Sequence, residues 1–182
     1  MCSTFLTFIY VAGTLTAAIL QVASLVTQSW FVGDEQLSVG TAKRLYGLFF
    51  SCTTQNVTEN QCILIWNRLS SQEKAAAVCF ILAVAFSALS FIWGCVNCFA
   101  CCCRSCLTMP LAILAGIGFV LNFTGACLMA SSQGISISEF VNEAKEQSFG
   151  LSMWICVASV AVTLVNTVVG IILALASKVC PC

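Results

Sequence analysis

The residues best able to do chemistry in this chain are its cysteines, because it has fourteen of them and no histidine. Histidine is the commonest acid–base group and transition-metal ligand, so its absence weighs against catalysis and most metal sites. Six cysteines gather in one segment, as Cys95, Cys98, Cys101, Cys102, Cys103 and Cys106. The first three have the spacing that opens an iron–sulfur sequence, but Ser105 interrupts it and no second group of ligands follows. We expect neither a metal nor a cofactor.

Palmitoylation suits these thiols better than metal binding. Thiols at a cytosolic membrane face stay reduced and can carry acyl chains that enter the lipid. The candidates are Cys98, Cys101, Cys102, Cys103, Cys106, Cys180 and Cys182. Inert cysteines at the membrane interface are the alternative.

The composition indicates an integral membrane protein. Of the 182 residues, 60% are hydrophobic and 8% are charged, against about 25% charged in a soluble domain. The formal net charge is zero, which removes the electrostatic case for nucleic-acid binding. The sequence offers no serine–histidine–aspartate set, phosphate-binding loop or paired carboxylates, so we do not expect an enzyme.

Long stretches without charge predict four membrane-spanning helices, since a span needs about 20 apolar residues. The expected helices cover 7–26, 75–95, 107–129 and 151–176. The loops between them are 27–74, 96–106 and 130–150, and a tail follows at 177–182. We therefore expect one tetraspan domain over 1–182, a mainly α membrane protein built as a four-transmembrane-helix bundle.

The spans carry no Asp, Glu, Lys or Arg, so we expect no proton relay or ion-coupled site in them. Their most polar residues are Gln21, Asn122 and Asn166, and we expect each to hydrogen-bond another helix. The small residues spaced for close helix packing are Ala112 with Gly116 and Gly170 with Ala174. Pro110 is expected in the first turn of the third span, where it costs no hydrogen bond.

The first loop sets the expected orientation, because Lys and Arg counts leave it undecided. Asn56 begins an N-glycosylation acceptor sequence. Cys52 and Cys62 are the only cysteines of 27–74, which suits an oxidising compartment. We therefore place 27–74 and 130–150 outside the cell and both termini in the cytoplasm.

The same loop predicts a small extracellular antiparallel β-sheet with a disulfide joining two strands. The expected strands are 30–32, 36–40, 44–52 and 61–65. After them, Ser70 and Glu73 have the spacing of a capping box just before the second span.

A motif in this loop resembles the claudin signature, which reads Gly-Leu-Trp, two residues, Cys and, after a spacer, a second Cys. The matching residues are Trp30, Gly47, Leu48, Phe49, Cys52 and Cys62. Phe49 stands where claudins usually have tryptophan, and it stays aromatic. The four-span layout adds to the resemblance, and the tripeptide at 148–150 is similar to the peripheral-myelin and calcium-channel gamma-subunit types of the same superfamily.

The resemblance implies a left-handed four-helix bundle under the sheet, with Cys52 paired to Cys62. It implies that Trp30 and residues 47–49 anchor the sheet, although Trp30 alone would also fit an aromatic anchor at the membrane interface. In the second outer loop, Glu139 and Phe140 would contact a neighbouring subunit.

The implied function is self-association at cell–cell junctions of the plasma membrane, with copies of itself and related claudin-like proteins, in cis and in trans. The product would be a paracellular barrier or adhesion, and the mixed charges of the first loop predict no ion selectivity. The alternative is an auxiliary subunit of a channel or receptor. The short tail, which lacks the Tyr-Val end of many claudins, favours that alternative.

Overall fold

The structure is a computed structural model that describes the backbone of 2–27, 29–37, 40–54, 60–64, 66–99, 104–132 and 150–179. Side chains are described over a narrower set, which leaves out those of the strands. This part of the chain contains four long helices and a four-stranded sheet.

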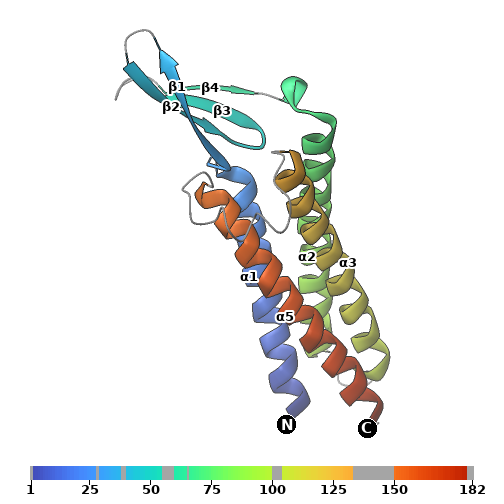
Figure 1. The fold of residues 1–182 in the computed structure, drawn as a ribbon. Helices are drawn as coiled ribbons and strands as arrows, with labels where there is room; N and C mark the ends of the chain where they lie inside the picture. The colour runs from blue at the N-terminus through green and yellow to red at the C-terminus, as the bar shows by residue number, and fades with distance from the viewer. Residues whose placement is uncertain are drawn as a thin grey trace.

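Each of the four helices is long and apolar enough to cross a membrane, which confirms the predicted multi-pass membrane protein. They are α1 (Cys2–Val26), α2 (Ser71–Phe99), α3 (Arg104–Ser132) and α5 (Leu151–Val179). Contacts join α1 to α2 and α5, and join α3 to the same two helices, so the four close into a bundle. The start of α1 and the end of α5 lie at one end of the bundle, and the sheet lies at the other (Figure 1).

The helices extend beyond the predicted spans because polar residues also continue them. The capping box is confirmed: the Ser70 amide donates to Glu73 Oε2 at 2.7 Å, and the Glu73 amide donates to Ser70 Oγ at 3.3 Å.

At the third span the prediction for Pro110 is wrong. Since α3 begins at Arg104, Pro110 lies inside the helix and beyond its first turn. The helix nevertheless continues, because lipid offers no partners to backbone groups freed by a break.

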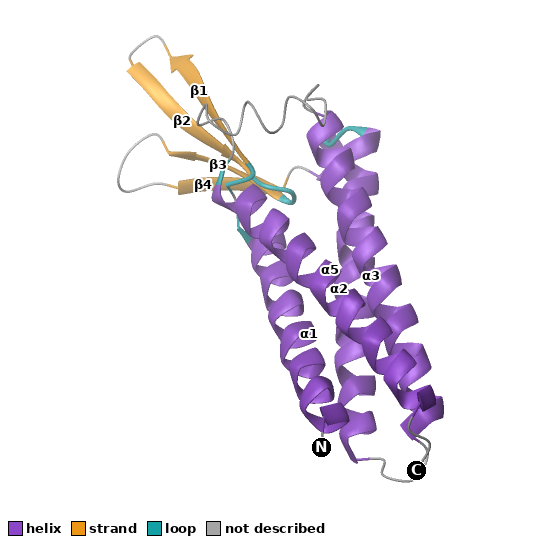
Figure 2. Cartoon of the chain, turned by 60° about the horizontal axis from the view of Figure 1, so that its bottom comes forward, coloured by secondary structure: helices purple, strands orange, loops and turns teal. Residues whose placement is uncertain are grey.

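The strands form an antiparallel sheet in the order β1-β2-β3-β4 (Figure 2). They are β1 (Phe31–Leu37), β2 (Gly40–Tyr46), β3 (Phe50–Thr54) and β4 (Asn60–Leu64), and a short 3₁₀ helix, η1 (Trp66–Arg68), leads into α2. The prediction of a single strand over 44–52 is wrong, because a turn at 47–49 divides this segment between β2 and β3. The sequence there is apolar because the turn is buried in part, so its pattern looks like that of a strand. The side of the membrane on which the sheet lies remains a prediction.

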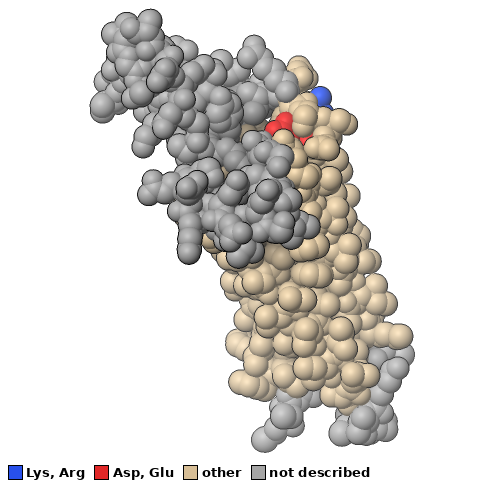
Figure 3. All heavy atoms as spheres, in the orientation of Figure 1, with Lys and Arg blue, Asp and Glu red and all other residues tan. Residues whose placement is uncertain are grey.

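The outer faces of the helices carry large apolar side chains that are half or more exposed, such as Phe8, Ile92, Val120 and Val165. The charged side chains that the structure describes, Glu73 and Lys74, lie near the start of α2 at the sheet end (Figure 3). An apolar outer belt with charge at its end is the distribution that a lipid environment favours.

Small residues bring the helices close together, as the spacing predicted. A Cβ added to Gly170 of α5 would lie 3.3 Å from the Cα of Ala112 in α3. One added to Gly125 of α3 would lie 2.9 Å from the ring of Phe80 in α2. At Gly125 the Phe80 ring occupies the space of a Cβ, whereas at Gly170 a Cβ would need its neighbours to move by a few tenths of an ångström.

Candidate functional site where the sheet meets the bundle

Trp30 connects the end of α1 to the core beneath the sheet. Its side chain is fully buried, and its ring centroid lies 5.4 Å from that of Phe80. The indole Nε1 donates a hydrogen bond to the Ser24 carbonyl at 2.9 Å. This carbonyl is among the last four of α1, which have no partner inside the helix. Trp30 is therefore a buried cap of α1, and the alternative of an aromatic anchor at the membrane interface is wrong.

The turn at 47–49 inserts into the same region from the sheet. Leu48 is buried in the apolar cluster that contains Trp30. The ring of Phe49 stacks on Trp66 of η1, with centroids 6.1 Å apart and planes at 17°. The fold thus brings together Trp30 and Leu48, two motif residues that are eighteen positions apart in sequence. Phe49 stands where the motif usually has tryptophan, and it still stacks on an aromatic ring.

The helices supply the other wall of this cluster, which we call the junction core. Its buried helical residues are Ala76, Ala77, Phe80, Met129, Ala130, Met153 and Cys156. Sequence reasoning did not identify them. Their signal in α2 was the spacing of Ala76, Ala77, Phe80 and Ala83, which places small and aromatic side chains on one helical face.

Backbone hydrogen bonds fasten the end of α1 to the start of α5. The amide of Gly150 donates to the Trp30 carbonyl at 3.0 Å, and that of Ser152 donates to the Ser29 carbonyl at 3.1 Å. Gly150 directly precedes α5 and Ser152 lies in its first turn, where amides have no acceptor inside the helix. A Cβ on Gly150 would lie 1.7 Å from the Ser29 oxygen, so this contact needs glycine.

Cys52 and Cys62 are directly opposite one another in the antiparallel pairing of β3 with β4. Opposed residues in such a pair have Cα atoms about 4.5–5.5 Å apart. That separation falls within the range of about 4.4–6.8 Å that a disulfide spans. The backbone register is therefore compatible with the predicted bond, although the two side chains lie outside the described set.

Several predicted residues fall outside the described part of the chain. These are Asn56, Glu139, Phe140, Cys101, Cys102, Cys103, Cys180 and Cys182. Of the other palmitoylation candidates, Cys98 is exposed near the end of α2, whereas Cys106 lies in the first turn of α3 with its side chain undescribed.

The bundle interior is more polar than predicted. Its buried side-chain amides make fewer hydrogen bonds than predicted. Asn122 confirms the expectation, because its Nδ2 donates to Ser159 Oγ of α5 at 2.9 Å. The prediction is wrong for Gln21, since neither of its amide atoms has a hydrogen-bond partner within the described residues. Tyr10, which sequence reasoning missed, joins three helices: its hydroxyl lies 2.5 Å from Ser90 Oγ and donates to the Leu111 carbonyl at 2.8 Å.

This arrangement holds a sheet on a bundle of four apolar helices. The turn at 47–49 contributes apolar packing, and Trp30 caps α1. Gly150 contributes a backbone hydrogen bond between the start of α5 and Trp30. No family model matches the chain, and no curated protein matches it.

Proposed function

We propose that this chain is a claudin-like cell-contact protein that self-associates through its extracellular loops to form a paracellular barrier or adhesion. The observation that carries this proposal is the junction core, in which Trp30 and Leu48 pack together beneath a sheet that sets Cys52 opposite Cys62. Those residues are among the ones that carry the resemblance to claudins. The burial of Trp30 and Leu48 in one cluster and the backbone register of Cys52 with Cys62 support it.

The orientation follows from the cysteine pair. A bond between Cys52 and Cys62 forms in an oxidising compartment, so the sheet would be extracellular and both termini cytoplasmic. The sheet would then stand above the lipid, held by the helix ends. Glu139 and Phe140 would contact a neighbouring copy or a related claudin-like protein, within one membrane or across the gap between two cells.

The test is expression in cells that lack junctional strands, with freeze-fracture imaging and transepithelial resistance as readouts. We expect intramembrane strands at cell contacts and a rise in resistance. The variant Phe140→Ala should reduce both, and Phe5→Ala serves as the matched control because Phe5 is exposed at the far end of α1.

A protein that reaches cell contacts but forms no strands and leaves the resistance unchanged would refute the junction proposal. An auxiliary subunit of a channel or receptor would then be the better hypothesis. Recovery of one channel or receptor together with the protein after mild detergent extraction would support that hypothesis.

We also propose that the cytoplasmic cysteines carry palmitate. Cys98 supports this, because its thiol is exposed close to the end of α2, where an acyl chain could enter the lipid. Hydroxylamine-dependent acyl exchange should label the wild type and should be lost when Cys98 and the four cysteines after it are changed to serine. Cys156→Ser, a buried position in α5, is the control that should keep the label.

A further inference from the structure

We infer that the bundle core binds one ordered water molecule in a cavity between the helices. The polar part of its lining comes from Thr14 of α1, Ser87 and Ser90 of α2, and Thr163 and Asn166 of α5. All five belong to the central parts of the apolar helices. This inference is independent of the proposed junctional function.

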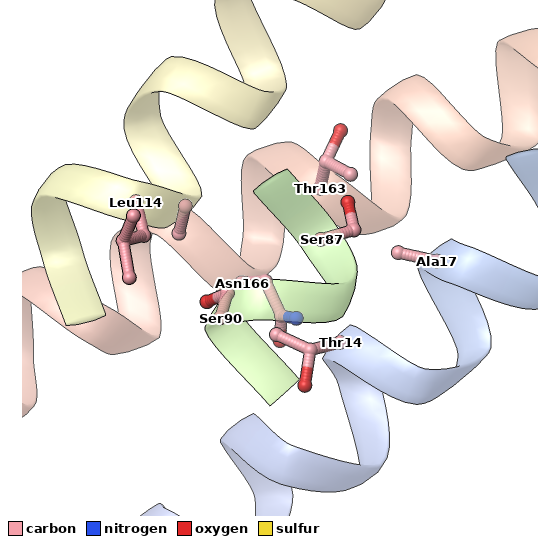
Figure 4. A pocket seen from close by; sticks show the side chains of 8 residues that line it. Thr14, Ala17, Ser87, Ser90, Leu114, Thr163 and Asn166 are labelled. Carbon is pink, nitrogen blue, oxygen red and sulfur yellow. The ribbon is translucent and has the colours of Figure 1, made fainter. Parts of the chain in front are cut away.

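The donor that needs this water is the side-chain amide of Asn166. The residue is 4% exposed, and its Nδ2 has no hydrogen-bond partner among the described residues. Its amide lies against Gly13 of α1, where an added Cβ would lie 2.2 Å from Asn166 Oδ1 and 3.1 Å from Nδ2. The oxygen is thus turned to Gly13, and the nitrogen points among the lining side chains (Figure 4). A buried N–H without an acceptor is costly, and lipid supplies none.

Two threonines of the lining are suited to accept from the water. Thr14 Oγ1 lies 2.9 Å from the Val11 carbonyl, and Thr163 Oγ1 lies 2.9 Å from the Val160 carbonyl. Each hydroxyl donates its hydrogen to its own helix, so its lone pairs remain available. A water molecule can therefore accept from Asn166 and donate to the threonines, which joins α1 to α5.

The size of the cavity selects the ligand. It offers about 10 Å³ to the centre of a water-sized sphere, and one water molecule needs about 10–15 Å³ by this measure. The lining residues are all neutral, so they offer no counter-charge to a bare ion in the membrane interior.

Water–amide cross-relaxation in NMR tests the site. The protein is labelled with ¹⁵N-asparagine and placed in lipid nanodiscs. We expect a cross-peak between a long-lived water and the side-chain amide of Asn166. The variant Ala17→Ser adds a hydroxyl to the cavity wall, so it should displace the water and abolish the cross-peak. Ala12→Ser, on the exposed face of α1, should retain it.

Two results would overturn the inference. One is the absence of the cross-peak in wild-type protein in which the Asn166 side-chain amide is resolved from that of Asn122. The other is a cross-peak of unchanged intensity in Ala17→Ser, since the water would then lie elsewhere. If Ala17→Ser does not fold, Ala115→Ser adds a hydroxyl to the same cavity and is judged by the same criterion.

Discussion

The side chain of Trp30 packs and donates at once, and one substitution separates these contributions. Trp30→Phe keeps a ring against Phe80 but removes the Nε1 donor, which leaves the Ser24 carbonyl unpaired. A buried acceptor without a partner costs about 1–3 kcal/mol, so we expect a lower midpoint of thermal unfolding in detergent. Trp154→Phe is the matched control, because that side chain is 48% exposed. Equal midpoints for Trp30→Phe and wild type would show that the hydrogen bond does not stabilise the fold.

For single residues, the sequence predicts burial better than it predicts hydrogen-bond partners. Gln21 and Asn122 are both polar residues in apolar stretches, and nothing local distinguishes them. Asn122 finds Ser159 because α3 and α5 bring the two into register, whereas Gln21 meets no described partner. Pairing depends on how the helices are placed relative to one another, which cannot be read from the local sequence around either residue.

The connection between α1 and α5 depends on a glycine. Gly150→Ala would put a Cβ against the Ser29 carbonyl, and since backbone cannot rotate away, the hydrogen bond from residue 150 to Trp30 would be lost. Overpacking of this kind costs about 1–3 kcal/mol. Gly116→Ala is the matched control, because its Cβ would lie 4.0 Å from the nearest atom, a methyl of Thr167. Denaturant titration should show a loss of stability for the first variant alone, and similar midpoints for both would contradict this account.

The pairing of β3 with β4 makes a separate prediction. If Cys52 and Cys62 form a disulfide, Cys52→Ser and Cys62→Ser should each lower stability by about 2–4 kcal/mol. Non-reducing peptide mapping should find one cross-linked peptide in wild type and none in either variant. Cys79→Ser, at a free half-buried cysteine of α2, should leave the cross-link intact. The bond would be refuted if residues 52 and 62 were both found as alkylated free thiols in protein that has passed through the secretory pathway.

Among the elements, the helices were predictable and the strand boundaries were not. Stretches without charge predict spans directly, because lipid excludes ionised side chains. The capping box was likewise predictable, since Ser70 and Glu73 satisfy each other locally. The turn at 47–49 was missed because its burial depends on helices far away in sequence, and the position of Gly150 against Ser29 is equally non-local.

The whole molecule has an orientation that glycosylation can report. If 27–74 is extracellular, Asn56 should carry a glycan, and Asn56→Gln should abolish the shift that peptide-N-glycosidase produces on a gel. A second acceptor sequence begins at Asn122, within α3, where the glycosylation machinery has no access. Thr124→Ala destroys that sequence without altering Asn122 and should leave the shift unchanged. A glycan shift that persists in Asn56→Gln would contradict the proposed placement of the loop.

The way the sheet is seated also determines how the protein bears mechanical load. Leu48 and Trp30 lie in one cluster with residues of α2, α3 and α5, and Gly150 ties the base of β1 to α5. A pulling force on the sheet therefore passes into several helices at once instead of along the two chain connections. Detachment would require the buried turn to leave its apolar surroundings while the α1–α5 hydrogen bonds break, so these contacts would resist tension together. On the proposed function, the sheet would experience this load whenever two adhering cells are drawn apart.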